Sequence, residues 1–340
     1  MSGVKIIKIS DYKKDIKEIF SDLNFKINPG EKVLIKPNLV MPREADSGVT
    51  TNLRLIAALV EILKDHQAIP ILAEGVGYEF NSQTFSILGI DQLVKNYNIQ
   101  FIDCRNCQTF SKKVSGQIFK KIELPKILEE VDKIINVPKL KTHVLTGVSC
   151  GMKNLIGLLP LSERRKMHLS GLSKSIVELN LIIPTDLTIV DASVIMSGQG
   201  PAFGDRVELG YLLAGKDVFQ VDLEAERFLK KHSVVIPKNR LYIFLYWLVY
   251  LFDFCQEKIT QKTLIPWLQW NFGSRPKLDA EKCHLFPECK ECIKLCPIGV
   301  IDKKKGIDFK RCVKIRCLKC FEVCPHKAIT IKGLSKPSIK

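Results

Sequence analysis

The start of the chain lacks the features of an export or targeting segment. It has no arginine-rich stretch and no apolar signal-peptide core, and residues 4–9 are predicted to form a first strand. Long apolar runs are also missing. The longest, residues 241–252, has twelve residues, whereas a membrane-spanning helix needs roughly 20. We therefore expect a cytoplasmic protein whose chain does not cross a membrane.

Acidic residues are scarce relative to basic ones. The chain has 36 Asp and Glu against 52 Lys and Arg, which gives a formal net charge of +16 at pH 7. This excess favours acidic partners such as phosphorylated ligands, anionic membrane surfaces or nucleic acid. The lysines are scattered, however, and no recognition helix, aromatic RNA-binding signature or zinc-finger spacing accompanies them. An anionic small molecule is therefore the expected partner, and nucleic-acid binding is not expected.

The length and the cysteine pattern bear on domain organisation. A chain of 340 residues with 46% hydrophobic residues predicts about two domains. Eight of its twelve cysteines fall between residues 283 and 324, in a spacing typical of metal ligands. In a small secreted protein so many cysteines would suggest disulfides, but this spacing indicates metal binding.

The cysteine-rich segment is an internal repeat. Its halves read Cys283-x5-Cys289-x2-Cys292-x3-Cys296-Pro297 and Cys312-x4-Cys317-x2-Cys320-x3-Cys324-Pro325. A C-x2-C-x3-C-P run supplies ligands to one cubane cluster and sends its last cysteine to the other. The sequence therefore predicts two four-iron four-sulfur (4Fe-4S) clusters. Their expected ligands are Cys283, Cys289, Cys292 and Cys324 for one, and Cys312, Cys317, Cys320 and Cys296 for the other.

This repeat resembles the dicluster ferredoxin domain, a small α+β module that we place at residues 273–334. It departs from the usual pattern in the first gap of each half, which has five or four residues where two are usual. A pair of zinc sites is the alternative, because four-cysteine spacings also bind zinc. Two Cys-Pro repeats with exchanged fourth ligands favour the clusters.

Residues 1–235 alternate short β-branched runs with amphipathic helical stretches. This alternation predicts an α/β domain with a mainly parallel sheet. The predicted strands are residues 4–9, 32–36, 69–73, 99–103, 133–137, 187–190 and 209–214. The clearest predicted helices are residues 12–23, 52–64 and 220–230.

Polar residues stand where these predicted strands end. They are Lys36, Asn38, Glu74, Asp103, Lys139, Lys141, His143 and Asp191. Open parallel sheets bind their ligands beyond the carboxyl ends of the strands, so these side chains are expected to converge on one site. The alternative is that the strand ends simply meet solvent, where polar residues are common.

Residues 138–157 combine cations with small residues. This composition suits an anion held by side-chain charges and backbone N–H groups, and Lys153 and Asn154 belong to it. The segment is not a Walker A loop, because its two glycines are one residue too close and no Ser or Thr follows the lysine.

Four cysteines lie outside the repeat: Cys104, Cys107, Cys150 and Cys255. The default expectation for each is a small packing residue. Cys104 and Cys107 are separated by two residues, a spacing that also suits a redox or metal-binding pair. Cys150 lies near cations in the glycine-rich segment, where a thiolate is the alternative.

Four separated segments carry a family resemblance. They are residues 35–40 (IKPNLV), 136–143 (NVPKLKTH), 151–157 (GMKNLIG) and 191–201 (DASVIMSGQGP). In this order they resemble domain-of-unknown-function family 362, over roughly residues 4–235. Members of that family often carry a C-terminal ferredoxin module, and the resemblance implies no particular activity. The residues to which it draws attention are Lys36, Asn38, Lys139, Lys141, His143, Lys153, Asn154 and Asp191.

Residues 236–272 are predicted to form an apolar helical bridge between the two domains. The aromatic-rich run 241–252 follows Lys238 and Arg240. Aromatic residues with a basic flank suit a helix that lies in the membrane interface, which would give a peripheral membrane contact. The alternative is a helix buried between the domains or in a dimer.

Together these features predict an iron-sulfur oxidoreductase. A redox partner protein would supply electrons, and the clusters would relay them to an anionic substrate, or an unidentified anionic organic cofactor, held by Lys139, Lys141 and Lys153. The other expected binding residues are Lys36, Asn38, Asn154 and Asp191. His143 and Glu74 are the candidates for proton transfer, because histidine titrates near neutrality and burial raises the pKa of a carboxyl group. The alternative is a non-enzymatic electron carrier or assembly partner whose α/β domain only docks a protein.

Overall fold

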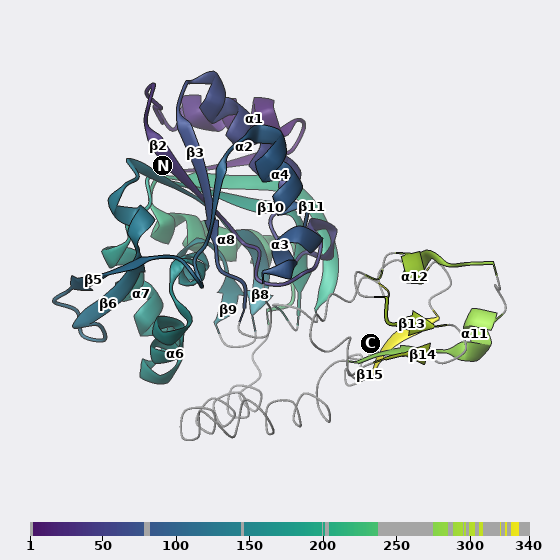
Figure 1. The fold of residues 1–340 in the computed structure, drawn as a ribbon. Helices are drawn as coiled ribbons and strands as arrows, with labels where there is room; N and C mark the ends of the chain where they lie inside the picture. Colours follow the sequence, from purple (N-terminus) through teal and green to yellow (C-terminus); the bar gives the residue numbers. More distant parts are fainter. Residues whose placement is uncertain are drawn as a thin grey trace. The chain divides into compact units, whose positions relative to one another are not determined.

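The computed structural model describes residues 3–77, 82–143, 146–198, 200 and 204–236, and in the C-terminal part residues 275–284, 288–294, 296, 299–302, 306–308, 320, 324 and 328–332. These residues fall into two compact units, one within residues 1–243 and the other within residues 244–340 (Figure 1).

The first unit is built on a nine-stranded sheet (Figure 1). Its main path runs in the order β1, β11, β10, β7, β2, β3, β4, and β8 pairs with both β10 and β9. Strands β11 and β9 run antiparallel to their neighbours, and the remaining pairs are parallel, so the mainly parallel sheet is confirmed. The strands are β1 (Val4–Lys8), β2 (Lys32–Pro37), β3 (Ile69–Glu74), β4 (Gln100–Asp103), β7 (Lys133–Val137), β8 (Lys139–His143), β9 (Gly147–Ser149), β10 (Leu187–Ser197) and β11 (Asp205–Gly215).

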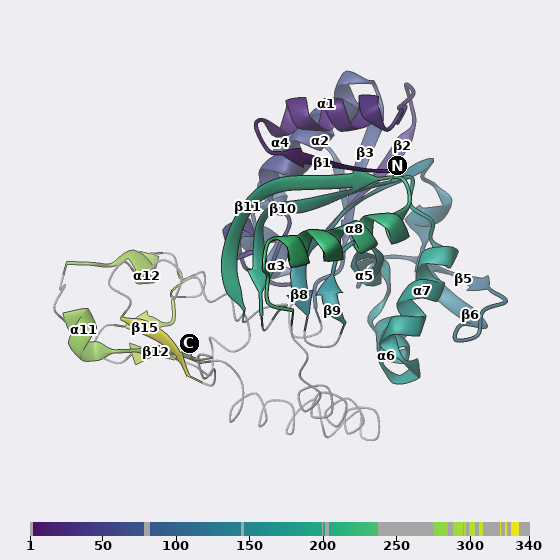
Figure 2. The same ribbon diagram turned by 180° about the vertical axis from the view of Figure 1, so that it is seen from behind.

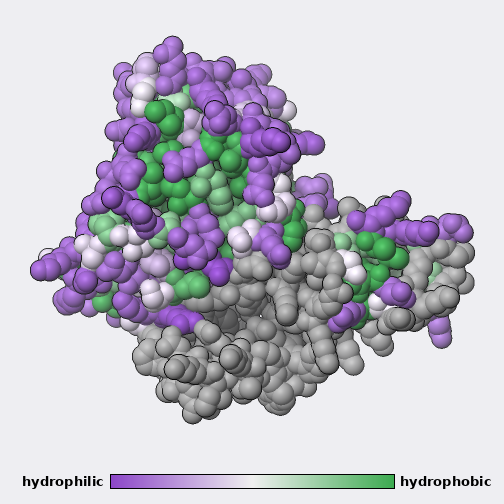
Figure 3. Space-filling view, in the orientation of Figure 1, coloured by the Kyte–Doolittle hydropathy of each residue, from purple (hydrophilic) through white to green (hydrophobic). Residues whose placement is uncertain are grey.

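Helices cover both faces of this sheet. On one face lie α1 (Tyr12–Asp22), α2 (Leu53–Asp65) and α4 (Ile90–Tyr97), and on the other lie α5 (Gly151–Asn154), α7 (Leu172–Ile182) and α8 (Val218–Lys231) (Figure 2). Hydrophilic side chains dominate the outline of the unit in Figure 3. The remaining elements are α3 (Gln83–Ile87), α6 (Leu161–Ser170), the hairpin of β5 (Thr109–Lys113) and β6 (Lys121–Pro125), and the 3-10 helices η1 (Ala45–Ser47), η2 (Lys126–Glu129) and η3 (Leu155–Leu158).

Local sequence explains where the main helices begin. Helices α1, α2 and α8 each follow a residue whose side chain accepts a hydrogen bond from an N–H group of the first turn, and these residues are Asp11, Asn52 and Asp217. Helix α2 then buries one apolar face that includes Leu55, Leu59 and Ile62. Each such buried side chain contributes on the order of 1.5–3 kcal/mol to folding, which holds the helix on the sheet.

The predicted elements of this unit are largely confirmed, with one correction near the polar residues. Residues 187–190 are only the first part of the eleven-residue strand β10, and Lys139–His143, expected to follow a strand, themselves form strand β8. The reason is that β10 changes its parallel partner from β7 to β8 at Pro138, which separates those two strands. Asp191 therefore lies inside a strand and not at the end of one.

The second unit contains short elements. Strand β12 (Arg275–Leu278) pairs antiparallel with β15 (Ile329–Lys332), and β13 (Ile301–Asp302) pairs with β14 (Gly306–Ile307). Two short helices, α11 (Ala280–His284) and α12 (Glu291–Lys294), precede β13. Cys292 and Cys320 belong to its small core, together with Ile301 and Ile329.

Some predictions fall on residues that the structure does not describe. The aromatic-rich run 241–252 and the expected cluster ligands Cys312 and Cys317 lie outside the described residues. Within the described part of the chain, no helix combines the length and the apolar character needed to cross a bilayer.

Candidate functional site

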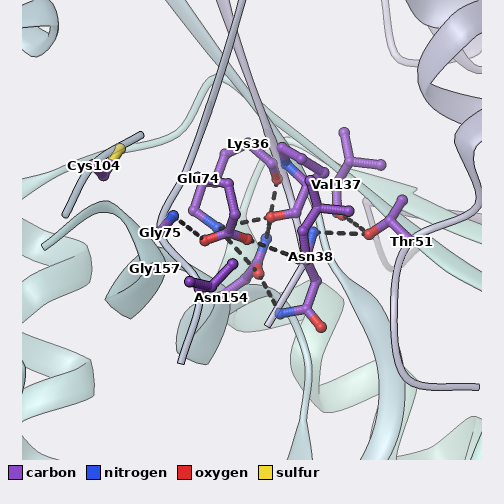
Figure 4. A network of polar contacts seen from close by, with 12 residues as sticks. Lys36, Asn38, Thr51, Glu74, Gly75, Cys104, Val137, Asn154 and Gly157 are labelled. Atoms are coloured by element: carbon purple, nitrogen blue, oxygen red, sulfur yellow. Dashed lines mark hydrogen bonds and ion pairs between the residues drawn. The ribbon is translucent and has the colours of Figure 1, made fainter. Parts of the chain in front are cut away.

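A buried ion pair joins the ends of β2 and β3 (Figure 4). Lys36 Nζ lies 2.9 Å from Glu74 Oε2 and also donates to the Pro37 carbonyl at 2.7 Å. Glu74 accepts two backbone N–H groups as well, from Leu39 at 2.9 Å and from Gly75 at 2.7 Å. Burial lowers the pKa of Lys36, and the charge of Glu74 counteracts that effect. The charges of this pair therefore compensate each other inside the protein.

Asn154 connects this pair to the neighbouring strand and helix. Its Nδ2 donates to the Lys36 carbonyl at 3.0 Å and to Asn136 Oδ1 of β7 at 2.8 Å, and its Oδ1 accepts from Asn38 Nδ2 at 3.0 Å (Figure 4). Asn136 in turn donates to the Gly151 carbonyl at 2.9 Å. One amide side chain thus holds helix α5 against β2 and β7.

A second buried pair links β8 to β10. Lys139 Nζ lies 3.0 Å from Asp191 Oδ2, and the two residues are opposite each other in the parallel ladder. Asp191 also accepts from the backbone N–H groups of Asn52 at 2.8 Å and Ser193 at 3.0 Å. Both charged side chains are fully buried, so this lysine too has its counter-charge beside it.

Lys141, two residues further along β8, has neutral hydrogen-bond partners. Its Nζ donates to Asn38 Oδ1 at 2.6 Å and to the Val49 carbonyl at 2.7 Å. The pKa of this amine is held well below its ordinary value, first by burial and then by the charges of Lys153 and Lys139. Its environment is therefore electropositive.

Lys153 lies on the short helix α5. In the part of the chain that the structure describes, its amine makes no hydrogen bond or ion pair, and burial lowers its pKa to about 8. The helix is anchored by Asp222 of α8, which accepts the N–H groups of Gly151 at 2.7 Å and Met152 at 3.0 Å. Burial raises the pKa of Asp222 to about 6.

Two histidines share the electrostatic environment of Lys153. The pKa of His143 is held well below its ordinary value by burial, then by Lys153, Lys141 and His168. The pKa of His168, on α6, falls to about 4 for the same reasons, with Lys153 and Arg164 as the charges. All of these charges are cations, so both histidines are neutral near pH 7. We call His143, His168 and Lys153 the Lys153 cluster, and its positive charge comes from the lysine. Such a cluster favours a bound anion.

One hydrogen bond bears on the tautomer of the neutral His143. Its Nδ1 accepts the N–H of Thr146 at 3.4 Å, which favours the tautomer with the proton on Nε2. The imidazole can therefore donate a hydrogen bond through Nε2 without being charged.

The structure sorts the residues expected from sequence into three groups. Lys36, Asn38, Glu74 and Asn154 form one network, Lys139 and Asp191 form a separate pair, and Lys141, His143 and Lys153 share the electropositive region. Asp103 is not among them, because its carboxylate accepts from Arg105 and Asn106 in the turn after β4.

Sequence reasoning missed several contributors, namely Asn136, Arg164, His168 and Asp222. Asn136 stood inside a motif already singled out and could have been included. Asp222 lies on α8, which packs against α5 from a distant part of the chain, and His168 lies on α6, outside every motif that the sequence analysis singled out, so no local signal indicated them.

In the second unit, four of the predicted cluster ligands lie close together. The pKa of Cys292 is raised by burial and then by the charges of Cys324, Cys283 and Cys289. Backbone N–H groups donate to two of the predicted ligands: Val300 to Cys296 Sγ at 3.4 Å, and Ala328 to Cys324 Sγ at 3.3 Å. Each donor lies four residues after its cysteine, so the sequence repeat is also a structural one.

The donor set consists of cysteines, and backbone N–H groups point at two of their sulfurs. Among the described residues, no three His, Cys, Asp or Glu side chains are placed to hold one metal ion. The thiolates of a cubane bind different irons and are spaced accordingly, and N–H donors to their sulfurs are a recognised feature of such sites. The donor set therefore fits an iron-sulfur cluster.

Comparison with known proteins gives one long match and two short ones. The family described as Domain of unknown function (DUF362) matches residues 33–225, more than half of the chain. Thylakoid-associated protein sll1697 of Synechocystis is 27% identical over 217 residues, which are 62% of this chain and 67% of that protein.

The two short matches are to a pyruvate synthase subunit and to a ferredoxin. Pyruvate synthase subunit PorD of Methanothermobacter marburgensis is 43% identical over 58 residues, 17% of this chain and 65% of that protein. A ferredoxin of Methanothermococcus thermolithotrophicus is 40% identical over 57 residues, 16% of this chain and 93% of that protein.

Proposed function

The chain belongs to the DUF362 family, and we propose that it is an iron-sulfur oxidoreductase that couples one-electron transfer to chemistry on an anionic ligand in its α/β unit. The observation that supports an anionic ligand in the α/β unit is the Lys153 cluster. It combines an amine that has no partner in the described part of the chain with two histidines whose pKa values are lowered by burial and then by neighbouring cations.

We assign two 4Fe-4S clusters to the second unit. Support comes from the proximity of Cys283, Cys289, Cys292 and Cys324, and from the short ferredoxin and PorD matches, whose 57 and 58 residues suit a module of the size of 273–334. The remaining ligands would be Cys296, Cys312, Cys317 and Cys320. Bound clusters would supply single electrons received from a redox partner protein.

Within the proposed anion site, the roles of the lysines differ. Lys36 and Lys139 already face Glu74 and Asp191, so we assign them to the architecture of the site. Lys153 would bind the anion directly, and Lys141 would add positive potential. His143 would donate through Nε2 and move a proton at that atom. Glu74 is less suited to that role, because both of its oxygens already accept buried hydrogen bonds.

We place the protein in the cytoplasm with a peripheral membrane contact through residues 241–252. A relative named as thylakoid-associated and the aromatic-rich run support this contact. Flotation of the full chain with anionic liposomes at low and high salt tests it, and absence from the liposome fraction in both conditions would exclude it.

Iron analysis of anaerobically purified full-length protein tests the two proposed clusters. We expect about eight irons and eight sulfides per chain, and about four irons in Cys292→Ser. Cys150→Ser is the matched control, because Cys150 is also buried but lies in the first unit, and it should keep all the iron. A colourless wild-type protein, or equal iron in both variants, would exclude the proposed ligands.

Calorimetric titration with inorganic phosphate tests the proposed anion site. Lys153→Ala should weaken binding by about tenfold or more, because a charge-assisted hydrogen bond is lost. Lys174→Ala, an exposed lysine on α7, is the control and should bind like the wild type. Equal phosphate affinities of both variants would exclude Lys153 as the anion-binding residue. They would favour the alternative of a non-enzymatic electron carrier.

A further inference from the structure

The turn after β4 brings two thiols together in the first unit. Cys104 follows the last residue of β4, and Cys107 lies three residues later with its Sγ 3.6 Å from the Cys104 carbonyl oxygen. Asp103 fixes the turn, since its carboxylate accepts the Arg105 N–H at 3.0 Å and the Asn106 side-chain amide at 3.0 Å. The Cys104 thiol donates to the Ile102 carbonyl oxygen at 3.9 Å, and the two thiols lie close enough for each to shift the pKa of the other.

The two thiols differ in accessibility. Cys104 is 1% exposed, whereas Cys107 is only half-buried. The hydrogen bond from Cys104 lowers the pKa of Cys107 to about 7, while the same bond and burial raise the pKa of Cys104 well above its ordinary value. An accessible thiolate beside a buried resolving thiol is the arrangement that thiol-disulfide exchange requires.

We propose that Cys104 and Cys107 are a reversible dithiol-disulfide site that exchanges with the disulfide of a low-molecular-weight thiol. The Cys107 thiolate attacks one sulfur of that disulfide; a Cys107–S bond forms, the original S–S bond breaks, and one thiolate leaves with the electron pair. Cys104 then loses its proton and attacks Cys107 Sγ, which forms the internal disulfide and releases the second thiolate. Two protein thiols are oxidised, one external disulfide is reduced, and two protons pass to the released thiolates.

The site is electrostatically connected to the buried network. The Cys104 N–H donates to the Glu74 carbonyl at 2.9 Å, and Figure 4 shows Cys104 near Glu74 and Gly75. The charges of Glu74 and Lys36 both act on the Cys104 thiol. Oxidation removes the titratable thiol beside this pair, so the redox state of the turn and the network around Lys36 are coupled.

A metal site is the competing reading of a C-x2-C spacing. The structure gives no support to it, because no third His, Cys, Asp or Glu among the described residues completes a group that could hold an ion. The proposal also stands apart from the iron-sulfur proposal, since it involves neither the second unit nor the Lys153 cluster.

Peptide mapping of the full-length protein tests the exchange. The anaerobic protein is incubated with mixtures of reduced and oxidised glutathione, free thiols are alkylated, and trypsin is added. Cleavage after Arg105 separates Cys104, in residues 96–105, from Cys107, in residues 106–112. We expect the two peptides to be joined by a disulfide at high oxidised glutathione and to separate again after reduction.

Two variants identify the order of attack. Cys104→Ser should accumulate glutathione on Cys107, because the resolving thiol is gone, whereas Cys107→Ser should leave the buried Cys104 unmodified. Cys150, buried and without a neighbouring cysteine in the first unit, serves as the internal control and should stay reduced. Recovery of peptides 96–105 and 106–112 as separately alkylated species at every glutathione ratio would overturn the proposal. So would equal glutathione labelling of Cys104 and Cys107 in the two variants.

Discussion

The first unit contains two kinds of lysine, fully buried and partly buried, and they differ in what faces them. Lys36 and Lys139 each lie about 3 Å from a buried carboxylate, whereas Lys153 shares its surroundings with His143 and His168. A buried charge without a counter-charge costs free energy, so it persists only where another requirement maintains it. The paired lysines therefore build the site, and the Lys153 cluster is the part that we propose binds a ligand.

The largest expected effect comes from breaking a paired lysine. Glu74→Gln should lower the free energy of unfolding by about 3–5 kcal/mol, because Lys36 then remains buried without its counter-charge. Urea denaturation followed by circular dichroism measures this. The control is Glu208→Gln, whose carboxylate pairs with Arg206 on the surface and should cost less than about 1 kcal/mol. Equal losses in the two variants would contradict the structural role of the buried pair.

Crowding the same pair should have a smaller effect. A methyl group on Gly157 would lie 2.1 Å from Glu74 Oε1 and 2.7 Å from Lys36 Nζ. Gly157→Ala should therefore cost about 1–3 kcal/mol, as other overpacked cores do. Gly3→Ala, where the added group meets nothing within 4 Å, is the control for the same denaturation measurement. A Gly157→Ala variant with the free energy of unfolding of the wild type would show that the network around Lys36 and Glu74 rearranges without cost.

The Lys153 cluster should appear as a pH dependence of stability. The folded pKa of His168 is about 4 and its unfolded pKa is about 6.5, so the unfolded state binds the extra proton between these values. Stability is therefore present above about pH 6.5 and falls toward pH 4, by up to about 1.4 kcal/mol per pH unit for this one group. His168→Gln should remove this contribution.

Asp222 acts in the opposite direction within the same window. Burial raises its pKa to about 6, so its contribution to stability is present below its unfolded pKa and is lost as the pH rises toward 6. The measurement is therefore the difference between wild type and His168→Gln in denaturation experiments from pH 4 to pH 8. Above about pH 7 the free energies of unfolding of the two proteins should change with pH in parallel. Parallel curves from pH 4 to pH 8 would contradict the lowered pKa of His168.

The smallest expected change in stability is that of Lys153→Ala. The variant loses a cation that has no partner in the described part of the chain, so its free energy of unfolding should differ from wild type by less than about 1 kcal/mol. The pKa values of His143 and His168 should both rise, because Lys153 lowers them. Imidazole NMR titration measures these values. A stability loss as large as that of Glu74→Gln would erase the distinction between the two kinds of cation.

Local patterns in the sequence were sufficient for most elements of the first unit. Apolar periodicity located α1, α2 and α8, and the rule that ligands bind beyond the carboxyl ends of parallel strands identified Lys36 and Glu74. It misplaced Lys139 and Asp191, because a strand with alternating lysines reads as an exposed segment unless its partners are known. Which acid neutralises which lysine depends on contacts between residues 38 to 52 positions apart. Such pairing cannot be read from local sequence.

The helix that carries Lys153 has only four residues. A single turn pays the full entropic cost of helix nucleation without the bonds of a longer helix to repay it, so α5 would not persist on its own. It exists because Asp222, Asn136 and Asn180 hold its backbone from three directions. Loss of any of these hydrogen bonds would displace Lys153 and Asn154 together. Binding of the proposed anion and packing of this helix on the sheet would then be lost in one cooperative step.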